Sequence, residues 1–184
     1  MRSDQVLIII DMQQGMQAAH LPARNNPEAE AQMSKLLSAW RQHDRPIVHV
    51  RHLSRSPQSV FWPGQPGVLF QEAFMPAASE PVFDKQTPDA FSQTGLEHWL
   101  HQRGLRRLLI VGVSTNHSVE STARSAGNLG FDTEVVADAC FTFAQTDCAG
   151  TVHSAEVVHA MALANLQAEY ARVVLTHNVL ARAG

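Results

Sequence analysis

The chain has few lysines, no strong excess of charge and no long apolar run. These features argue against several classes of protein. Only Lys35 and Lys85 among its 14 basic residues are lysine, and 17 acidic residues leave a formal net charge of -3. This balance does not suggest a protein that binds nucleic-acid phosphates or a membrane surface. The longest apolar runs, residues 6–10 and 108–111, are far shorter than the roughly 20 residues of a membrane span. Neither nucleic acid nor membrane is therefore an expected partner.

Cysteine is also scarce, since Cys140 and Cys148 are the only two. A chain of 184 residues can bury enough apolar surface without disulfides, so both are expected to be free thiols. No cleavable leader is visible, because Asp11 directly follows the first apolar run. We expect a cytoplasmic protein with a single domain over residues 1–184.

Short apolar runs alternate with stretches of helical periodicity along the chain. Continuous β-branched runs are typical of strands that are buried on both faces of a parallel sheet. The alternation predicts right-handed β-α-β crossovers and an α/β fold with helices on both faces of the sheet. The strands are predicted at residues 6–10, 47–51, 81–83, 108–113, 133–137 and 172–175.

Capping residues indicate where the helices begin. Asn26 before Pro27 predicts the cap of the first helix. Thr94 and Glu97 predict a capping box for the next one. Ser154 is expected to open the last helix, and four apolar positions at helical spacing predict its buried side: Val157, Met161, Ala164 and Ala168.

The segment from 54 to 81 has no period and is rich in Ser, Pro, Gly and aromatic residues. Loops of this length are usually functional or disordered. Its aromatic side chains supply apolar area for packing, which makes disorder less favoured.

Polar side chains follow three of the predicted strands: Asp11, Lys85 and, at a helix start, Ser118. Taken singly, each is typical of a turn former, a solvated charge or a helix cap. Ligands of parallel sheets bind at the carboxyl ends of the strands. A carboxylate, an ammonium and a hydroxyl could therefore converge there, beside a helix N-terminus that favours an oxyanion.

Three ordered motifs span most of the chain: LIIIDMQ at 7–13, FDKQTPDAF at 83–91 and VGVSTNHSVESTARSAGNLGF at 111–131. In these motifs the sequence resembles the isochorismatase-like hydrolases, also called the cysteine hydrolase family. The resemblance implies a three-layer α/β/α fold with a Rossmann-like central sheet, a small-molecule substrate, and a homodimer or higher homo-oligomer. It also implies an Asp-Lys-Cys triad at a subunit pocket, of which Asp11 and Lys85 match the first two members.

Ser118 stands where most members of that family carry the cysteine. In those members the Asp takes the thiol proton and the thiolate attacks a carboxamide to give an acyl-enzyme. A hydroxyl needs a well-placed base for the same step, because its proton is held far more tightly than that of a thiol. The resemblance further implies a cis peptide between Val113 and Ser114, and an oxyanion hole formed by the N–H groups of Ser114 and Ser118.

We expect a hydrolase of an amide-like C–N bond, with Asp11, Lys85 and Ser118 as its catalytic residues and with Ser118 acting as the nucleophile or positioning a water. Two alternatives stay open: hydrolysis of a vinyl ether with Asp11 as general acid, and a catalytically silent homologue that only binds a small molecule. Side chains expected to line the substrate pocket are those of His52, Trp62 and His117.

No metal and no other cofactor is expected. His49 and His52 lie near where the nicotinamidase branch of the family carries its metal ligands, but the Asp of that pattern is absent. Strand alternation also places His49 on one face with Arg51, and His52 beyond the strand end.

Overall fold

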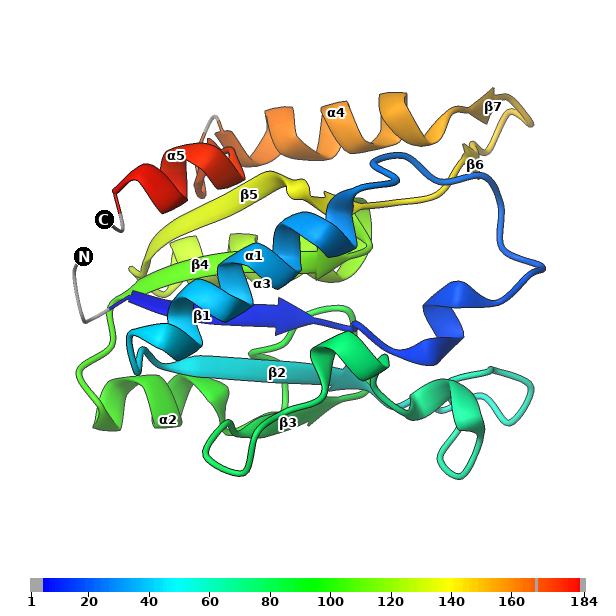
Figure 1. Ribbon diagram of the computed structural model, residues 1–184. Coiled ribbons are helices and arrows are strands. Elements are labelled where there is room, and N and C mark those ends of the chain that lie inside the picture. The colour runs from blue at the N-terminus through cyan, green and yellow to red at the C-terminus, as the bar shows by residue number, and fades with distance from the viewer. Residues whose placement is uncertain (1–4, 168, 183–184) are drawn as a thin grey trace.

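The computed structural model describes residues 5–167 and 169–182, and its centre is a six-stranded parallel sheet (Figure 1). The strand order is β3-β2-β1-β4-β5-β8, and every neighbouring pair is parallel. The strands are β1 (Gln5–Ile10), β2 (Ile47–His52), β3 (Val82–Lys85), β4 (Arg107–Val113), β5 (Asp132–Phe141) and β8 (Arg172–Val174). All six predicted strands are therefore confirmed, and β5 runs four residues past its predicted end.

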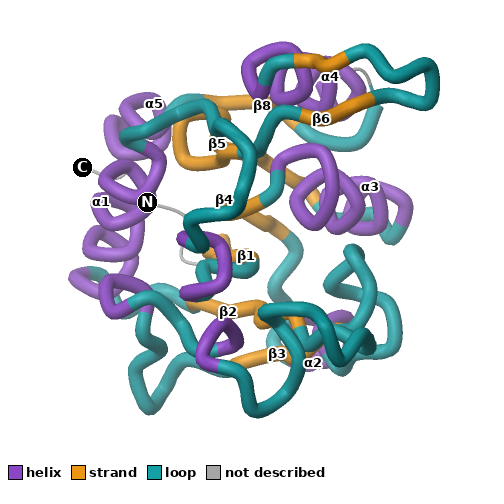
Figure 2. The backbone as a smooth tube through the Cα atoms, turned by 90° about the vertical axis from the view of Figure 1, so that its right-hand side faces the viewer, coloured by secondary structure: helices purple, strands orange, loops and turns teal. Residues whose placement is uncertain are grey.

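Helices cover both faces of this sheet, which confirms the three-layer α/β/α fold. Helices α1 (Ala29–Gln42) and α5 (Thr176–Ala181) lie on one face. Helices α2 (Leu96–Gln102), α3 (Glu120–Asn128) and α4 (Ala155–Gln167) lie on the other (Figure 2). A short antiparallel hairpin of β6 (Gln145–Thr146) and β7 (Val152–His153) precedes α4. No helix in the described ranges has the length and apolar character that crossing a bilayer demands.

The continuous apolar run of β1 supplies both halves of the core, because successive side chains point to opposite faces. Leu7 and Ile9 pack on the α1 side, and Ile8 and Ile10 pack on the side of α2 and α3. Helix α1 buries an apolar face against the first group: Met33, Leu36, Leu37 and Trp40.

The first helix does not start as predicted. Asn26 is not its cap, since α1 begins at Ala29 and no side chain caps it. Asn26 instead adopts a left-handed φ of 46°, which asparagine tolerates better than most residues. Its Nδ2 donates to the carbonyl oxygens of Ala137 at 3.0 Å and Cys140 at 2.7 Å. The side chain thus binds carbonyl groups of β5 and does not cap α1.

The capping box predicted for the second helix is also wrong. Thr94 Oγ1 accepts from the N–H of Leu96 at 3.2 Å and donates to Ala90 O at 2.6 Å. Helix α2 therefore begins one residue after Gly95, without a side-chain cap. The hydroxyl bonds two residues ahead, a local alternative to capping that threonine offers.

The predicted buried side of α4 is in fact its exposed side. Val157 and Met161 are 53% and 61% exposed, and Ala164 is exposed as well. The helix buries another stripe: Ala155, His159, Ala162 and Leu166. Ala168 lies outside the described residues. Because both stripes are largely apolar, helical spacing alone could not choose between them.

The long segment before β3 is ordered by its aromatic residues and by two helical turns, Pro66–Val68 and Glu72–Phe74. Phe74 is fully buried on the α1 side of the core and Phe70 is 7% exposed. The prediction that these side chains pack is confirmed.

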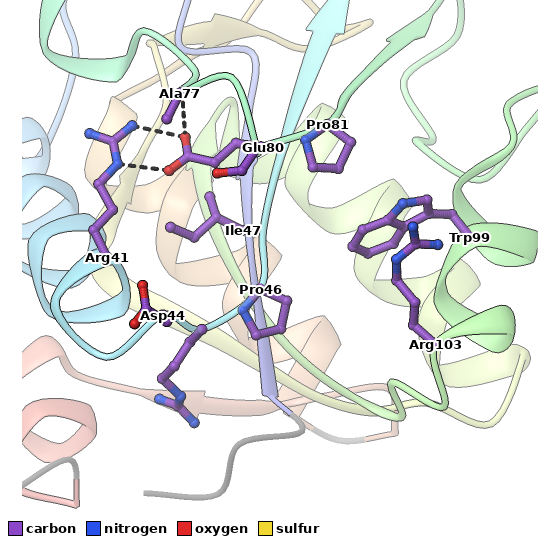
Figure 3. Close-up of a pocket in the computed structure, with 11 residues that line it drawn as sticks. Arg41, Asp44, Pro46, Ile47, Ala77, Glu80, Pro81, Trp99 and Arg103 are labelled. Atoms are coloured by element: carbon purple, nitrogen blue, oxygen red, sulfur yellow. Dashed lines mark hydrogen bonds and ion pairs between the residues drawn. The ribbon is translucent and has the colours of Figure 1, made fainter.

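The carboxylate of Glu80 connects the end of this segment to α1, as Figure 3 shows, and also to His49 of β2. Its two oxygens accept from Arg41 Nε at 2.7 Å and Nη2 at 2.8 Å, and Oε2 also accepts from Ala77 N–H and from His49 Nε2. Burial alone would raise the pKa of Glu80, but the hydrogen bonds from Arg41, Ala77 and His49 lower it to about 2. The carboxylate is therefore charged in the folded protein at any pH near neutrality.

We predict that Glu80→Gln costs stability in a pH-dependent way. Because the folded-state pKa of Glu80 is about 2 against an ordinary glutamate value of 4.5, its contribution to stability is present above pH 4.5 and is lost as the pH falls through 2. Urea unfolding of both proteins across this range should give a difference in unfolding free energy that shrinks toward pH 2. The exposed Glu72→Gln should change stability by less than about 0.5 kcal/mol throughout. A pH-independent Glu80→Gln effect would contradict the role of the charge.

Gly112 allows β4 to approach β1 closely. It has a φ of +129° and lies in register with Ile10. A Cβ on Gly112 would lie 2.2 Å from the carbonyl oxygen of Ile10. Any side chain here therefore meets both backbone strain and a steric clash.

We predict that Gly112→Ala lowers the free energy of unfolding by about 2 kcal/mol or more, because the clash is with backbone and cannot relax. Gly95→Ala is the matched control, since its Cβ would meet only Phe83 Cε1 at 3.8 Å; we expect a change below about 0.5 kcal/mol. Equal stability losses in the two variants, measured by urea denaturation, would refute this account.

Candidate active site

Three side chains meet at the carboxyl edge of the sheet, which faces the viewer in Figure 2. Asp11 directly follows β1, Lys85 is the last residue of β3, and Ser118 lies in a π-helical turn, Thr115–Val119, after β4. Since all the strands are parallel, their carboxyl ends lie at one edge. The sheet therefore brings together residues that are far apart in the sequence.

The three side chains form a closed triangle of hydrogen bonds. Asp11 Oδ2 accepts from Lys85 Nζ at 2.8 Å and from Ser118 Oγ at 2.6 Å. Lys85 Nζ also donates to Ser118 Oγ at 3.1 Å. Asp11 and Lys85 are each 1% exposed and Ser118 is 8% exposed. In the described part of the chain, the other carboxylate oxygen, Asp11 Oδ1, has no hydrogen-bond partner.

The backbone around these residues has unusual geometry. Asp11 has a φ of 53°, and the Val113–Ser114 peptide is cis, as the resemblance implied. Val119 N–H donates to Ser114 O at 3.2 Å, a bond across five residues that shapes the π-helical turn. In the described part of the chain, no backbone carbonyl accepts the N–H of Ser114.

Side chains behind the turn hold it in place. Thr115 Oγ1 and His159 Nδ1 of α4 lie 2.8 Å apart in the interior. Burial lowers the pKa of His159, which favours the neutral ring, and this ring shares a hydrogen bond with the Thr115 hydroxyl. Asn116 bonds Thr142 and donates to Gln145 Oε1 at 3.0 Å. Sequence reasoning missed these contacts, because nothing local marks a partner 44 positions away.

Gln13 was also missed, although it lies in the first motif. Its buried carboxamide accepts the His52 N–H at 2.8 Å and donates to His52 O at 3.0 Å and Val68 O at 3.1 Å. It thereby extends the sheet where β1 has ended and fixes His52 and the loop together. The amide follows Asp11 by only two residues, so the same turn positions both.

His52 lies beside the triangle. It is the last residue of β2 and pairs in register with Lys85, so the prediction that it lies beyond the strand end is wrong. Burial lowers the pKa of His52, and the charge of Lys85 lowers it further. Its ring meets Phe61 edge-on at 5.9 Å. Among the described residues its Nδ1 has no partner.

Trp62 and His117 have no hydrogen bond or ring contact with the triangle in the described structure. His117 is exposed and its Nε2 lies 2.6 Å from Gln145 Nε2. It therefore does not pair with Ser118. Trp62 is half-buried, and its backbone bonds Ser59 and Gln65 within the loop.

The remaining candidate ligands and nucleophiles lie elsewhere. His49 Nε2 is bonded to Glu80, and the His49 ring meets Phe70 edge-on. The His52 ring instead contacts Phe61, so the two histidines have different neighbours. Within the described ranges no three His, Cys, Asp or Glu side chains gather closely enough to hold a metal ion. Cys140 and Cys148 are both free thiols, as expected. Burial raises the pKa of Cys140 to about 12, which makes it a poor nucleophile.

Comparison with known proteins places this geometry in a family. The model of the isochorismatase domain matches residues 5–178. An isochorismatase family protein of Bacillus subtilis is 33% identical over 180 residues, covering 98% of this chain and 96% of its own length. A hydrolase of the isochorismatase family from Chromobacterium violaceum has a crystal structure with a TM-score of 0.96. It is 46% identical, and the match covers 100% of this chain and 96% of that one. Maleamate amidohydrolase of Pseudomonas putida is 32% identical over 117 residues, which cover 64% of this chain and 50% of that protein.

We predict that Lys85→Met destabilises the protein by about 3–5 kcal/mol, because it leaves the buried Asp11 carboxylate without its cation. Adding Asp11→Asn removes the unpaired charge, so the double variant should recover part of that loss in urea unfolding. If the stability loss of the double variant equals the sum of the losses in Lys85→Met and Asp11→Asn, the two side chains are not energetically coupled.

Proposed function

The chain belongs to the isochorismatase family, and from that premise we propose that it hydrolyses the C–N bond of a small carboxamide with Ser118 as the nucleophile. Asp11 acts as the base and Lys85 stabilises the charges that form. The proposal extends to a homo-oligomer, which the exposed apolar stripe of α4 supports.

One observation carries the proposal: the Ser118 hydroxyl donates to Asp11 Oδ2 at 2.6 Å inside a nearly closed site. A nucleophile bonded to its base is the arrangement that activates a hydroxyl. Lys85 donates to Asp11 Oδ2 and to Ser118 Oγ, so it stabilises negative charge on either oxygen. The weaker acidity of a hydroxyl makes this base necessary.

The reaction follows from these contacts. Ser118 Oγ attacks the carboxamide carbon while its proton moves to Asp11. The carbonyl oxygen becomes an oxyanion, which the N–H groups of Ser114 and Ser118 stabilise. When the C–N bond breaks, Asp11 returns the proton to the leaving nitrogen and an ester to Ser118 remains. Water, deprotonated by Asp11, then attacks the ester, and the acid leaves as the Ser118 hydroxyl is restored.

The names of the relatives support an amide substrate. One is a maleamate amidohydrolase, and a nicotinamidase/pyrazinamidase of Mycobacterium tuberculosis is 35% identical over 102 residues, which cover 47% of this chain. The free Nδ1 of His52 and the predicted walls Trp62 and His117 would orient the substrate.

A second candidate is hydrolysis of a vinyl ether with Asp11 as general acid. The observation that favours it is Asp11 Oδ1, which is buried and without a partner among the described residues. A protonated carboxyl could deliver its proton from that oxygen to the substrate, and water would complete the reaction without a covalent intermediate.

The test is ammonia release from a panel of small carboxamides by the protein and its variants. We expect release by the unmodified protein and a loss of at least about 10³-fold in Ser118→Ala, because the covalent route is removed. Ser118→Cys should remain active, since a thiol is the better nucleophile. Ser114→Ala is the matched control and should keep its activity, because its role rests on the backbone N–H.

Other outcomes separate the alternatives. Release by Ser118→Cys alone would overturn the serine nucleophile while leaving the pocket intact. Hydrolysis of isochorismate that survives in Ser118→Ala but disappears in Asp11→Asn would establish the vinyl-ether reaction. If neither the protein nor any variant hydrolyses either substrate, the alternative that remains is a catalytically silent protein that only binds a small molecule.

A further inference from the structure

The π-helical turn that carries Ser118 has no side-chain cap of its own. Its backbone bonds span five residues on both sides of Ser118. Val119 N–H donates to Ser114 O, and Glu120 N–H donates to Thr115 O. Such turns are rare and occur as single turns, frequently at functional sites. Contacts from other parts of the chain must therefore favour this turn over an ordinary α-helical start.

His159 of α4 reaches the first residue of the turn. In Figure 2, α4 lies next to α3, which begins where the turn ends. His159 Nδ1 lies 2.8 Å from Thr115 Oγ1, and a hydroxyl both donates and accepts, so the bond forms with either neutral tautomer of the ring. Thr115 is β-branched and has few side-chain rotamers. Holding its hydroxyl therefore limits how far the backbone of the turn can rotate.

The other ring nitrogen of His159 faces the loop before α1. His159 Nε2 lies 3.5 Å from Asn26 Nδ2, and this amide group donates to two carbonyl oxygens at the end of β5. Burial lowers the pKa of His159, which favours the neutral ring. The ring is thus packed between the turn and a segment that is itself bonded to the sheet.

The second residue of the turn is held by a neighbouring set of buried polar groups. Asn116 Oδ1 accepts from Thr142 Oγ1, and the N–H of Thr142 donates to Asn25 Oδ1 at 2.8 Å. Asn25 and Thr142 are 4% and 1% exposed. Two consecutive residues of the turn are therefore fixed by side-chain hydrogen bonds, and the bond at Thr115 comes from α4.

The position of the Ser118 hydroxyl depends on this turn. Its Oγ lies 2.6 Å from Asp11 Oδ2 and 3.1 Å from Lys85 Nζ. Thr115 and Ser118 are both buried, whereas the two residues between them are more exposed, so the two side chains share the inward side of the turn. A shift of Thr115 therefore also moves Ser118. Misplacing a reacting group by about 1 Å can cost about 10²-fold in rate.

We propose that His159 is a positioning residue, which holds the turn through Thr115 and so keeps the Ser118 hydroxyl on Asp11. The inference rests on the proposed function, because it takes Ser118 as the nucleophile. His159 is outside the triangle of Asp11, Lys85 and Ser118, so it acts on the reaction through the turn.

Two substitutions of nearly equal size separate positioning from packing. Asparagine at 159 keeps a polar group near the place of Nδ1, and leucine does not. In His159→Leu we expect kcat for carboxamide hydrolysis to fall about tenfold or more, with KM within about threefold. His159→Asn should keep kcat within about threefold, because the bond to Thr115 can form again. Ammonia release over a range of substrate concentrations measures both constants.

The matching change at Thr115 separates activity from stability. Thr115→Val should lower kcat as much as His159→Leu does, and the double variant should lower it no further, because both changes remove one bond. Since the double variant leaves no buried polar group unpaired, its urea midpoint should recover toward that of the unmodified protein. A residue with a structural role alone would recover its activity together with its stability.

A double-mutant cycle tests the same link without substrate. Ser118→Ala removes the hydroxyl bonds to Asp11 and Lys85, so it should lower the urea midpoint. In the His159→Leu background this shift should be smaller by about half or more, because the hydroxyl is already displaced. His98 is an exposed histidine of α2 and gives the matched control. Its Leu and Asn variants should keep kcat within about twofold and leave the Ser118→Ala shift unchanged.

Two results would overturn the inference. An equal loss of kcat in His159→Leu and His159→Asn would mean that the ring acts by its packing and not by its bond to Thr115. Additive shifts of the urea midpoint for His159→Leu and Ser118→Ala would mean that the ring does not hold the hydroxyl. If the unmodified protein releases no ammonia, the proposed hydrolase fails, whereas the urea cycle still decides whether His159 positions Ser118.

Discussion

The structure depends on an ion pair that is almost completely withdrawn from water. The side chains of Lys85 and Asp11 are 0% and 1% exposed, and their bond is 2.8 Å long. Burying two charges costs several kcal/mol for each, which only close geometry and further hydrogen bonds offset. Ser118 supplies one of those bonds to each partner. The ends of β1 and β3 and the turn after β4 must therefore assemble together, and the same contacts that make burial tolerable create the reactive group.

Much of the fold was predictable because its strands are buried on both faces. Such strands are continuous apolar runs, so the six strands could be found without knowing their neighbours. Helix α4 was not predictable in the same way, because Val157 and His159 lie on opposite sides of it and its composition does not show which side meets the sheet. Asn26 was misread because its side chain serves carbonyl groups of β5, more than 100 residues away.

In the candidate site, too, some residues were predictable from the local sequence and others were not. Asp11, Lys85 and Ser118 could be proposed because each ends or follows a strand or lies at a helix start, and three motifs gave their order. The residues that hold these three in place could not be predicted, because their contacts are distant in sequence. Gln13 binds His52 across 39 positions, and His159 contacts Thr115 across 44. Local pattern therefore marks the residues that face a ligand, whereas the groups that hold them are defined only by tertiary contacts.

The bonds of Gln13 have a consequence for the motion of the loop after β2. One carboxamide engages His52 twice and Val68 once, and Gln71 returns a bond to the backbone of Gln13. Because one side chain joins the end of β2 to Val68 in the loop, Val68 cannot leave without freeing the buried amide. Opening of this loop is thus a single cooperative unit of local unfolding rather than a series of small fluctuations. Exchange of the His52 amide proton with solvent would report the population of that open form.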